Sequence, residues 1–271
     1  MPQAQTLFID GEWVSAENGA TREIYCPADG REVGTVSEGT SGDAERAVLA
    51  ARAAFDKGEW RNTPAAERGD FLIKVGDELL RRKDEFAKAE ALDTGKRLVE
   101  AEGDMEDIAN CFRYFGKVAD SNPGRLVDAG DDTVIDRVVN EPIGVCGMIT
   151  PWNFPLLQAS WKIAPAIAAG NTFVIKPSEL TPHTTIMIVR LMDELGLPKG
   201  VANVVTGDGA NVGSVLSSHP EVNLVSFTGG LETGRIIAKS AAEGVKQVAL
   251  ELGGKNPNVI FADADYDAAL D

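Results

Sequence analysis

The sequence holds few of the side chains that build metal centres and covalent cross-links. Among its 271 residues are three cysteines and two histidines. Cys26, Cys111 and Cys146 are an odd number at wide spacings, so they predict neither a disulfide framework nor a metal site, and we interpret each as a small packed hydrophobe. His183 and His219 each adjoin a proline, and we expect loop or cap residues rather than metal ligands. Free cysteines favour a reducing compartment, so we expect a cytoplasmic protein.

The sequence also has no long hydrophobic run and a deficit of positive charge. Lys162, Lys176 and Arg190 interrupt the longest apolar runs, so none approaches the ~20 residues of a membrane-spanning helix. Residues 1–10 lack the basic, apolar pattern of a signal peptide. With 26 basic against 42 acidic residues, the formal charge of −16 repels phosphate backbones and anionic lipids. We therefore expect neither nucleic acid nor a membrane as a partner.

The first part of the chain is expected to form a small hairpin followed by helices. Apolar and polar residues alternate from Leu7 to Trp13 around Asp10-Gly11, which is a hairpin signal. We expect Ser41 or Asp43 to cap the first helix and Thr63 to cap the second. Helical spacing of apolar residues predicts helices over residues 41–57, between 64 and 92, and over 99–118.

A β-rich segment is expected to separate these helices from the second half of the chain. Asn122-Pro123-Gly124 predicts a turn. The run Thr133–Val139 predicts a strand, paired with another that starts near Val145. We interpret residues 125–143 as a β-hairpin arm, and we expect it to serve in homo-oligomerisation.

In the second half, short apolar runs alternate with helical stretches. Such alternation is typical of parallel βαβ units, whose strands are covered on both faces and whose ligands bind at the carboxyl ends of the strands. The predicted strands are 144–150, 172–176, 203–206, 224–228 and 247–250.

Two of these strand ends carry polar side chains. Asn153, between two prolines, is either the N-cap of a helix or an amide that donates to a developing oxyanion. Lys176 ends an apolar strand, and Glu179 follows it. Together they are either an exposed ion pair or a grip on a ribose, in which the carboxylate accepts from the hydroxyls. A 2′-phosphate would meet like charge at Glu179, so the second interpretation favours NAD over NADP.

Three further strand ends carry glycines. The loop from Gly207 to Gly213 has the spacing G-x-G-x-x-x-G, one residue longer than the usual dinucleotide fingerprint, so by itself it is either a phosphate loop or a simple turn. Phe227-Thr228-Gly229-Gly230 opens another helix, and two such helix N-termini favour a dinucleotide site. Glu251 interrupts an apolar strand before two glycines. We expect its carboxylate to be desolvated, either as a general base or paired with a cation.

Taken in order, these segments resemble the aldehyde dehydrogenase family: T-P-W-N-F-P, K-P-S-E, G-x-G-x-x-x-G, F-T-G-G and E-L-G-G-K-N-P. The likeness runs from the hairpin at Asp10 to the last residue, and residues 91–96 and 107–115 look like betaine aldehyde dehydrogenases. The resemblance implies an α/β fold with a Rossmann-like parallel sheet flanked by helices, NAD as cofactor, and oxidation of an aldehyde to a carboxylic acid.

By position, the resemblance also implies the roles of individual residues. Asn153 would stabilise the oxyanion, Glu251 resembles the general base, and Lys162 matches a relay position. Asp93 would lie near a monovalent cation such as potassium. The residues assigned to NAD are Ile149, Thr150, Pro151, Trp152, Asn153, Lys176, Pro177, Ser178, Glu179, Gly209, Gly213, Phe227, Thr228, Gly229, Gly230, Thr233 and Gly253.

The nucleophilic cysteine of this family lies in a Gly-rich segment after E-L-G-G, but no cysteine follows Glu251 here. We expect residues 1–124 and 144–253 to form the NAD-binding domain, and 254–271 to be the start of a truncated catalytic domain. The chain is then inactive alone. The alternative is a non-catalytic nucleotide-binding or assembly partner from a truncated or split gene, docked with a separate catalytic half.

Two aromatic residues bear on the substrate. Phe154 and Trp161 lie seven residues apart, which places them on roughly one face of a helix that starts near Pro155. They either pack in the core or form part of an aromatic wall for a quaternary ammonium group. The second interpretation, with the acidic net charge, predicts betaine aldehyde or a related aminoaldehyde as the small-molecule substrate, rather than a neutral aliphatic aldehyde.

Overall fold

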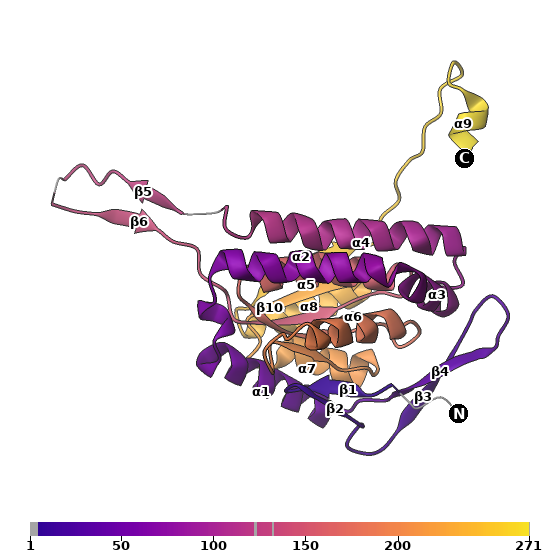
Figure 1. Cartoon of the computed structure of the whole chain (residues 1–271), viewed down its shortest axis with the longest axis horizontal. Coiled ribbons are helices and arrows are strands. Elements are labelled where there is room, and N and C mark those ends of the chain that lie inside the picture. Colours follow the sequence, from indigo (N-terminus) through magenta and orange to yellow (C-terminus); the bar gives the residue numbers. More distant parts are fainter. Residues whose placement is uncertain (1–4, 122–123, 132, 271) are drawn as a thin grey trace.

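The computed structural model describes residues 5–121, 124–131 and 133–270 (Figure 1). The turn predicted at Asn122-Pro123 lies outside these residues. The main sheet has seven strands in the order β11-β10-β7-β8-β9-β1-β2. Its strands are β1 (Leu7–Ile9), β2 (Glu12–Val14), β7 (Val145–Ile149), β8 (Thr172–Lys176), β9 (Ala202–Val204), β10 (Leu224–Gly229) and β11 (Gln247–Leu252).

The predicted alternation of strands and helices is confirmed in the second half. From β11 to β9 the strands are parallel, and only β1 and β2 are antiparallel. The helices are α1 (Ser41–Lys57), α2 (Ala65–Arg81), α3 (Lys83–Thr94), α4 (Leu98–Val118), α5 (Pro155–Ala168), α6 (His183–Glu194), α7 (Ser214–Ser218), α8 (Leu231–Glu243) and α9 (Tyr266–Leu270), with short turns η1 (Trp60–Asn62) and η2 (Gly209–Gly213).

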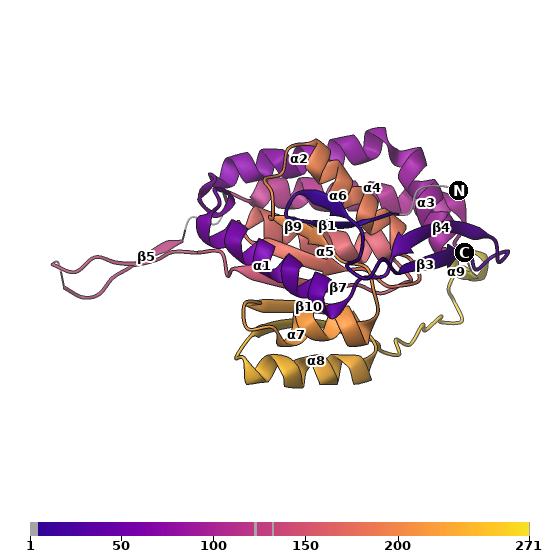
Figure 2. The same cartoon turned by 90° about the horizontal axis from the view of Figure 1, so that it is seen from below.

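Helices cover both faces of the sheet. α1, α7 and α8 pack on one face and share an apolar core with β7 and β10. α5 and α6 pack on the other face, where α2, α3 and α4 cover them in turn. Figure 2 shows α7 and α8 on one side of β10, and α2 and α4 on the other. The fold is therefore the α/β class with a parallel sheet flanked by helices that the sequence predicts.

The N-terminal hairpin forms as predicted. Leu7 pairs with Val14, and the turn residues Asp10 and Gly11 both have positive φ, as the tight turns favoured in hairpins require. β1 also pairs with β9, which joins the hairpin to the main sheet. A second hairpin of β3 (Thr21–Tyr25) and β4 (Glu32–Ser37) stands as a separate sheet that the sequence analysis did not predict.

The predicted helix caps are wrong by a few residues. Thr40, not Ser41 or Asp43, is the N-cap of α1, and Asp43 closes a capping box from inside the helix. Pro64, not Thr63, is the N-cap of α2, and the Thr63 hydroxyl donates instead to the Glu59 carbonyl oxygen. A cap depends on the local backbone conformation, which apolar spacing does not determine.

The pairing predicted for Val145 is also wrong. β5 (Arg125–Val127) pairs with β6 (Asp136–Val138) in a two-stranded ribbon, which Figure 1 shows projecting from the body. β7, which contains Val145, lies instead between β8 and β10. Every residue of β7 is buried, so its run of apolar side chains fits a central parallel strand and not a solvated hairpin.

The hairpin at 125–143 is thus present, but its use in oligomerisation and the domain boundaries at 124, 144 and 253 stay predictions. Figure 1 shows the segment that carries α9 leading away from the body. Within the described ranges, no helix combines the length and apolar character that a membrane crossing requires.

Two helices of the outer layer approach each other through glycine. Gly69 of α2 faces the backbone of Gly116 in α4, and a Cβ added at Gly69 would overlap the Gly116 carbonyl oxygen. Gly103, on the exposed side of α4, would meet nothing within 4 Å. The first glycine is therefore required for close packing, whereas the second only weakens its helix.

We predict that Gly69→Ala lowers the free energy of unfolding by ~1–3 kcal/mol, because overlap with α4 outweighs the gain in helix propensity. Gly103→Ala is the matched control and should raise it by up to about 1 kcal/mol. Urea unfolding of both variants measures the difference. Equal effects of the two substitutions would contradict the close approach of α2 and α4.

Candidate functional site

The carboxyl ends of the parallel strands meet at one edge of the sheet. Ile149 pairs with Lys176 on one side and with Phe227 on the other, and Thr228 pairs with Glu251. The chain runs from β7 outward to β8 and β9, and then to β10 on the opposite side of β7. Such a reversal of strand order opens a crevice for ligands. Here a cleft of about 680 Å³ lies at that point.

This cleft brings together most of the predicted cofactor residues. Those that line it are Ile149, Thr150, Pro151, Trp152, Lys176, Ser178, Glu179, Gly209, Gly213, Phe227, Thr228, Gly229, Gly230 and Thr233. Pro177 does not line it, and its carbonyl oxygen accepts from the Lys176 ammonium at 2.9 Å. Asn153 and Gly253 line a neighbouring cleft instead.

Lys176 is the buried cation of the cleft. Its side chain is only 3% exposed, and its Nζ also lies 3.3 Å from Oε2 of Glu179. Burial lowers the pKa of Lys176 against the pull of Glu179. Burial opposes ionisation of Glu179 as well, but Lys176 and Arg22 hold its pKa below the ordinary value. The half-exposed Glu179 carboxylate is thus held in place, in its charged form, at the rim of the cleft. An ion pair between two exposed side chains would not hold it in this way.

The two glycine loops differ in whether a side chain caps the N-terminus of the helix that each one opens. Asp208 caps η2, where its Oδ1 accepts from the Asn211 amide at 2.7 Å. Gly230, the N-cap of α8, supplies no side-chain hydrogen bond. An uncapped helix N-terminus offers N–H groups and a positive dipole end to an anion. The start of α8 is therefore more open to an anion than the start of η2.

Other features of the cleft also suit a dinucleotide. A Cβ at Gly209 or Gly230 would meet nothing within 4 Å, so the backbone there is open to a ligand. Thr150 Oγ1 is buried and has no hydrogen-bond partner among the described residues. Such an orphaned hydroxyl calls for a polar partner. The residues present therefore fit a nucleotide cofactor.

One side of the cleft is formed by residues that the sequence did not predict. Its residues share an origin on η2, α7 and α8, and they are Ala210, Ser214, Ser217, Ser218, Ile236, Ile237 and Ser240. The spacing of the three α7 serines is a helical signal that could have been used. The packing of α7 against α8 is a tertiary contact that no local pattern reveals.

A second cleft of about 460 Å³ adjoins the first and holds the predicted catalytic residues Asn153 and Glu251. Pro151, Trp152 and the Thr228–Gly230 loop line both clefts, so the two are continuous. The expectation that Glu251 is desolvated is wrong, because its side chain is exposed. β11 is an edge strand of this sheet, and although α8 packs against it and Leu250 joins the apolar core, Glu251 itself stays exposed.

Lys162 lies beneath the second cleft, on α5. Its Nζ donates to Thr228 Oγ1 at 2.8 Å and to Ser226 Oγ at 3.2 Å. Burial lowers the pKa of Lys162 to about 8, although the nearby Glu251 favours the charged form. The ammonium is therefore poised to lose a proton in mildly alkaline solution.

Phe154 and Trp161 do not pack in the core, because their side chains are 40% and 51% exposed. Trp161 lines the second cleft, and Phe154 does not. Lys96 Nζ lies 4.2 Å from the centroid of the Phe154 ring, so one ring face already holds a cation. Of the two aromatics, Trp161 is the one that the structure places at the cleft.

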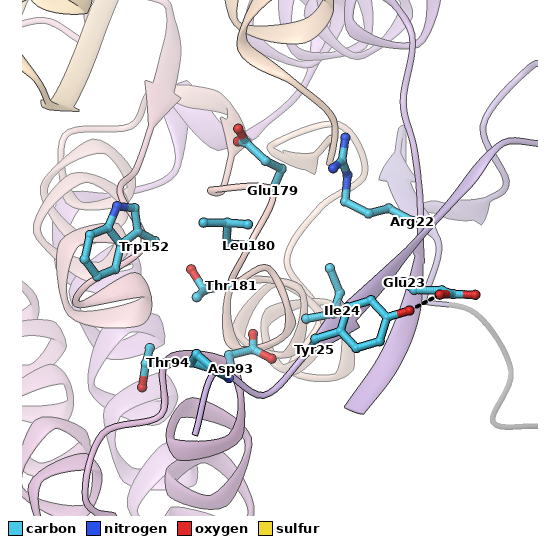
Figure 3. A pocket seen from close by; sticks show the side chains of 11 residues that line it. Arg22, Glu23, Ile24, Tyr25, Asp93, Thr94, Trp152, Glu179, Leu180 and Thr181 are labelled. Atoms are coloured by element: carbon cyan, nitrogen blue, oxygen red, sulfur yellow. Dashed lines mark hydrogen bonds between the residues drawn. The ribbon is translucent and has the colours of Figure 1, made fainter. Parts of the chain in front are cut away.

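A third cavity, of about 570 Å³, reaches from Asp93 and Thr94 to Arg22 and Glu179 (Figure 3). Both carboxylate oxygens of Asp93 are engaged by His183, through its backbone N–H at 2.9 Å and its Nδ1 at 2.6 Å. Among the described residues no group of three acidic, histidine or cysteine side chains is arranged to hold a metal ion. The monovalent-cation role of Asp93 stays a prediction.

The cysteines and His219 lie as predicted, but His183 is a residue of α6 itself and not a loop or cap residue. His183 begins α6, and His219 caps the end of α7. Cys26 and Cys146 are buried and Cys111 is partly buried. None of the three cysteines lines any of the three cavities.

The family model described as "Aldehyde dehydrogenase family" matches residues 13–271. The chain therefore belongs to the aldehyde dehydrogenase family.

Within that family the chain is similar to betaine aldehyde dehydrogenases. It is 54% identical to the betaine aldehyde dehydrogenase of Bacillus subtilis, over 99% of this chain and 55% of that protein. It superposes with a TM-score of 0.96 on the Staphylococcus aureus betaine aldehyde dehydrogenase, solved in complex with NAD+, at 52% identity over 98% of this chain and 53% of that one. Aminoaldehyde dehydrogenase 2 of Zea mays is 44% identical. The chain spans about half the length of these relatives.

We predict that the pKa of Lys162, about 8, makes stability depend on pH. The unfolded chain keeps this proton to higher pH, so the free energy of unfolding should rise between about pH 8 and 10.5 relative to Lys162→Met. Urea unfolding across this range measures the difference. Lys239→Met, at an exposed position, is the control, and its free energy of unfolding should change with pH as in the wild type. If the free energy of unfolding of K162M also rises as steeply with pH as that of the wild type, the burial of this ammonium is contradicted.

Proposed function

We propose that this chain is the cofactor-binding half of an NAD-dependent aldehyde dehydrogenase that oxidises betaine aldehyde to glycine betaine. The observation that carries the proposal is the pair at the end of β8, where buried Lys176 fixes the Glu179 carboxylate at the rim of the cleft. The cleft continues to Asn153 and Glu251. Betaine aldehyde dehydrogenase of Staphylococcus aureus, which has the same fold, was solved with NAD+.

The residues of the first cleft would bind and orient the cofactor. The Glu179 carboxylate accepts hydrogen bonds from ribose hydroxyls, and the uncapped N–H groups at the start of α8 favour the diphosphate. The Trp152 turn and Gly253 border the second cleft, where the nicotinamide end would lie. When bound, NAD accepts the hydride that leaves the substrate carbon.

The second cleft would hold the reacting carbonyl. The Asn153 amide donates to the oxygen on which negative charge develops. Glu251 is exposed to the same cleft, where it can accept a proton from a thiol or a water. Lys162, which has a lowered pKa and lies close to Glu251, would pass that proton on.

The nucleophile does not come from these residues, because no cysteine lines either cleft. On this account residues 1–271 bind NAD and do not oxidise aldehydes, and chemistry requires the Cys-bearing part that full-length relatives contain. The alternative is a non-catalytic nucleotide-binding or assembly partner. Exposed apolar side chains of β11 and the following segment, including Val248, Val259 and Phe261, would suit docking of a separate catalytic half.

The β5–β6 hairpin is proposed to serve a homo-oligomer. Leu126 and Ile135 are 77% and 85% exposed on it, so another copy of the chain would bury apolar surface there. The cytoplasmic location stays a prediction, as does a potassium ion near Asp93.

We predict that the chain binds NAD more tightly than NADP, because a 2′-phosphate would meet the charge of Glu179. Glu179→Gln should narrow the ratio of the two dissociation constants by about tenfold, equal to ~1.4 kcal/mol. Isothermal titration with each cofactor measures this ratio.

Glu232→Gln is the matched control, since Glu232 lies in the first turn of α8 but does not line the cleft. It should change both affinities by the same factor. Equal binding of NAD and NADP by the wild type would refute the proposal, and an unchanged ratio in E179Q would remove Glu179 from it.

For the substrate, we predict that Trp161→Ala in a longer chain containing the family's cysteine lowers kcat/KM for betaine aldehyde by about 2- to 30-fold, the value of one cation–π contact. An uncharged aldehyde of similar size should be affected less. Trp161→Phe keeps an aromatic face and should retain most of the preference. If W161A lowers kcat/KM by the same factor for both aldehydes, a cation-binding role of Trp161 is excluded.

A further inference from the structure

The start of α5 carries the residues that reach the clefts but lacks a cap of its own. Phe154 is the N-cap and provides no side-chain hydrogen bond, and Pro155 follows it. The first N–H groups of a helix need an acceptor from elsewhere. Trp152 and Asn153 precede this helix directly, so whatever fixes its first turn also fixes their position.

A buried carboxyl group on another helix supplies the acceptor. Glu90 of α3 is fully buried, and its Oε1 lies 3.4 Å from the Leu156 backbone nitrogen, in the first turn of α5. Its Oε2 accepts from Thr184 Oγ1 of α6 at 2.6 Å. One side chain thus ties the start of α5 to two other helices.

The same carboxyl group is linked to the other side of the turn through Lys96. Lys96 Nζ lies 3.9 Å from Glu90 Oε1, donates to Asp104 of α4 at 2.6 Å, and lies over the Phe154 ring. The backbone N–H of Leu156 and the ring of Phe154 are therefore held on the two sides of Pro155.

We propose that Glu90 is a positioning residue, which together with Lys96 holds the Trp152–Phe154 turn where Asn153 and Trp152 reach the two clefts. The positioning role of Glu90 is argued from the geometry alone, whereas the identity of the ligands that bind in those clefts rests on the proposed function. Trp152 lines all three cavities, so a displaced turn would alter each of them.

The ionisation of Glu90 offers a way to test this role. Burial raises its pKa to about 7, against the effects of Thr184, Lys96 and the Leu156 N–H, while Asp93 on the same helix adds to the increase. Because the pKa in the unfolded chain is lower, near 4.5, the free energy of unfolding falls as pH rises from about 4.5 to about 7, and the loss is complete above that. Ionisation of Glu90 also strengthens the hydrogen bond from Leu156, since a charged acceptor binds an N–H more strongly.

The experiment follows the backbone amide of Leu156, the side-chain amide of Asn153 and the indole N–H of Trp152 by NMR from pH 5 to 9. In the wild type all three signals should shift together with a midpoint near 7. In Glu90→Gln, which keeps an acceptor and a donor but does not titrate, this step should vanish. A step that survives in E90Q does not come from Glu90 and counts against the inference.

Cofactor affinity gives the second measurement. Glu90→Ala should weaken NAD binding by about tenfold, because the uncapped turn loses its position, whereas E90Q should stay within about twofold of the wild type. Glu106→Ala, which removes an exposed carboxylate from the neighbouring α4, should have no effect.

The inference is overturned if the Asn153 and Trp152 signals titrate in E90Q as in the wild type, or if E90A binds NAD like the wild type. If E90A does not fold, the NMR comparison of E90Q with the wild type decides alone. Failure of the wild type to bind NAD would refute the proposed function and leave the NMR test of Glu90 intact.

Discussion

The parallel register of β8, β7, β10 and β11 brings the ends of these strands, with the groups that line the two clefts, to one edge of the sheet. Because the strands run in one direction, Lys176, Ile149, Thr228 and Glu251 all reach the same edge of the sheet. Covering helices on both faces keep the central strands buried, and the polar groups that line the clefts lie where the strands end. The reversal of strand order at β7 then opens the cleft at this edge of the sheet.

Three buried ionisable groups depend on this frame. Lys176, Lys162 and Glu90 each lose solvent. The partners of Lys162 and Glu90 come from other elements of the fold, whereas those of Lys176 come from the loop that follows its own strand. Burial of a charge is costly unless such partners are present. The cofactor cleft, the second cleft and the start of α5 thus have one buried group each, which links the packing of the fold to the chemistry proposed for it.

The strands and the cofactor cleft were predictable from the sequence, because a parallel sheet leaves continuous apolar runs that end in polar motifs. The exposure of Glu251 and the pairing of Val145 were not, since an apolar run does not say whether a strand lies at the edge or the centre of a sheet. Glu90 was missed for a related reason. Its partner Thr184 lies 94 residues away, and only tertiary packing joins them. The division of roles between the glycine loops depended on the cap at Asp208, which is a matter of local geometry.

The central claim is that the crevice between β7 and β10 is a dinucleotide site oriented from Glu179 toward Glu251. A crystal structure of this chain grown with NAD tests it most directly. We expect the adenosine ribose within hydrogen-bond distance of Glu179, the diphosphate at the start of α8, and the nicotinamide beside Trp152 and Gly253. A cofactor bound elsewhere on the chain, or bound in the opposite direction along the cleft, would contradict the account.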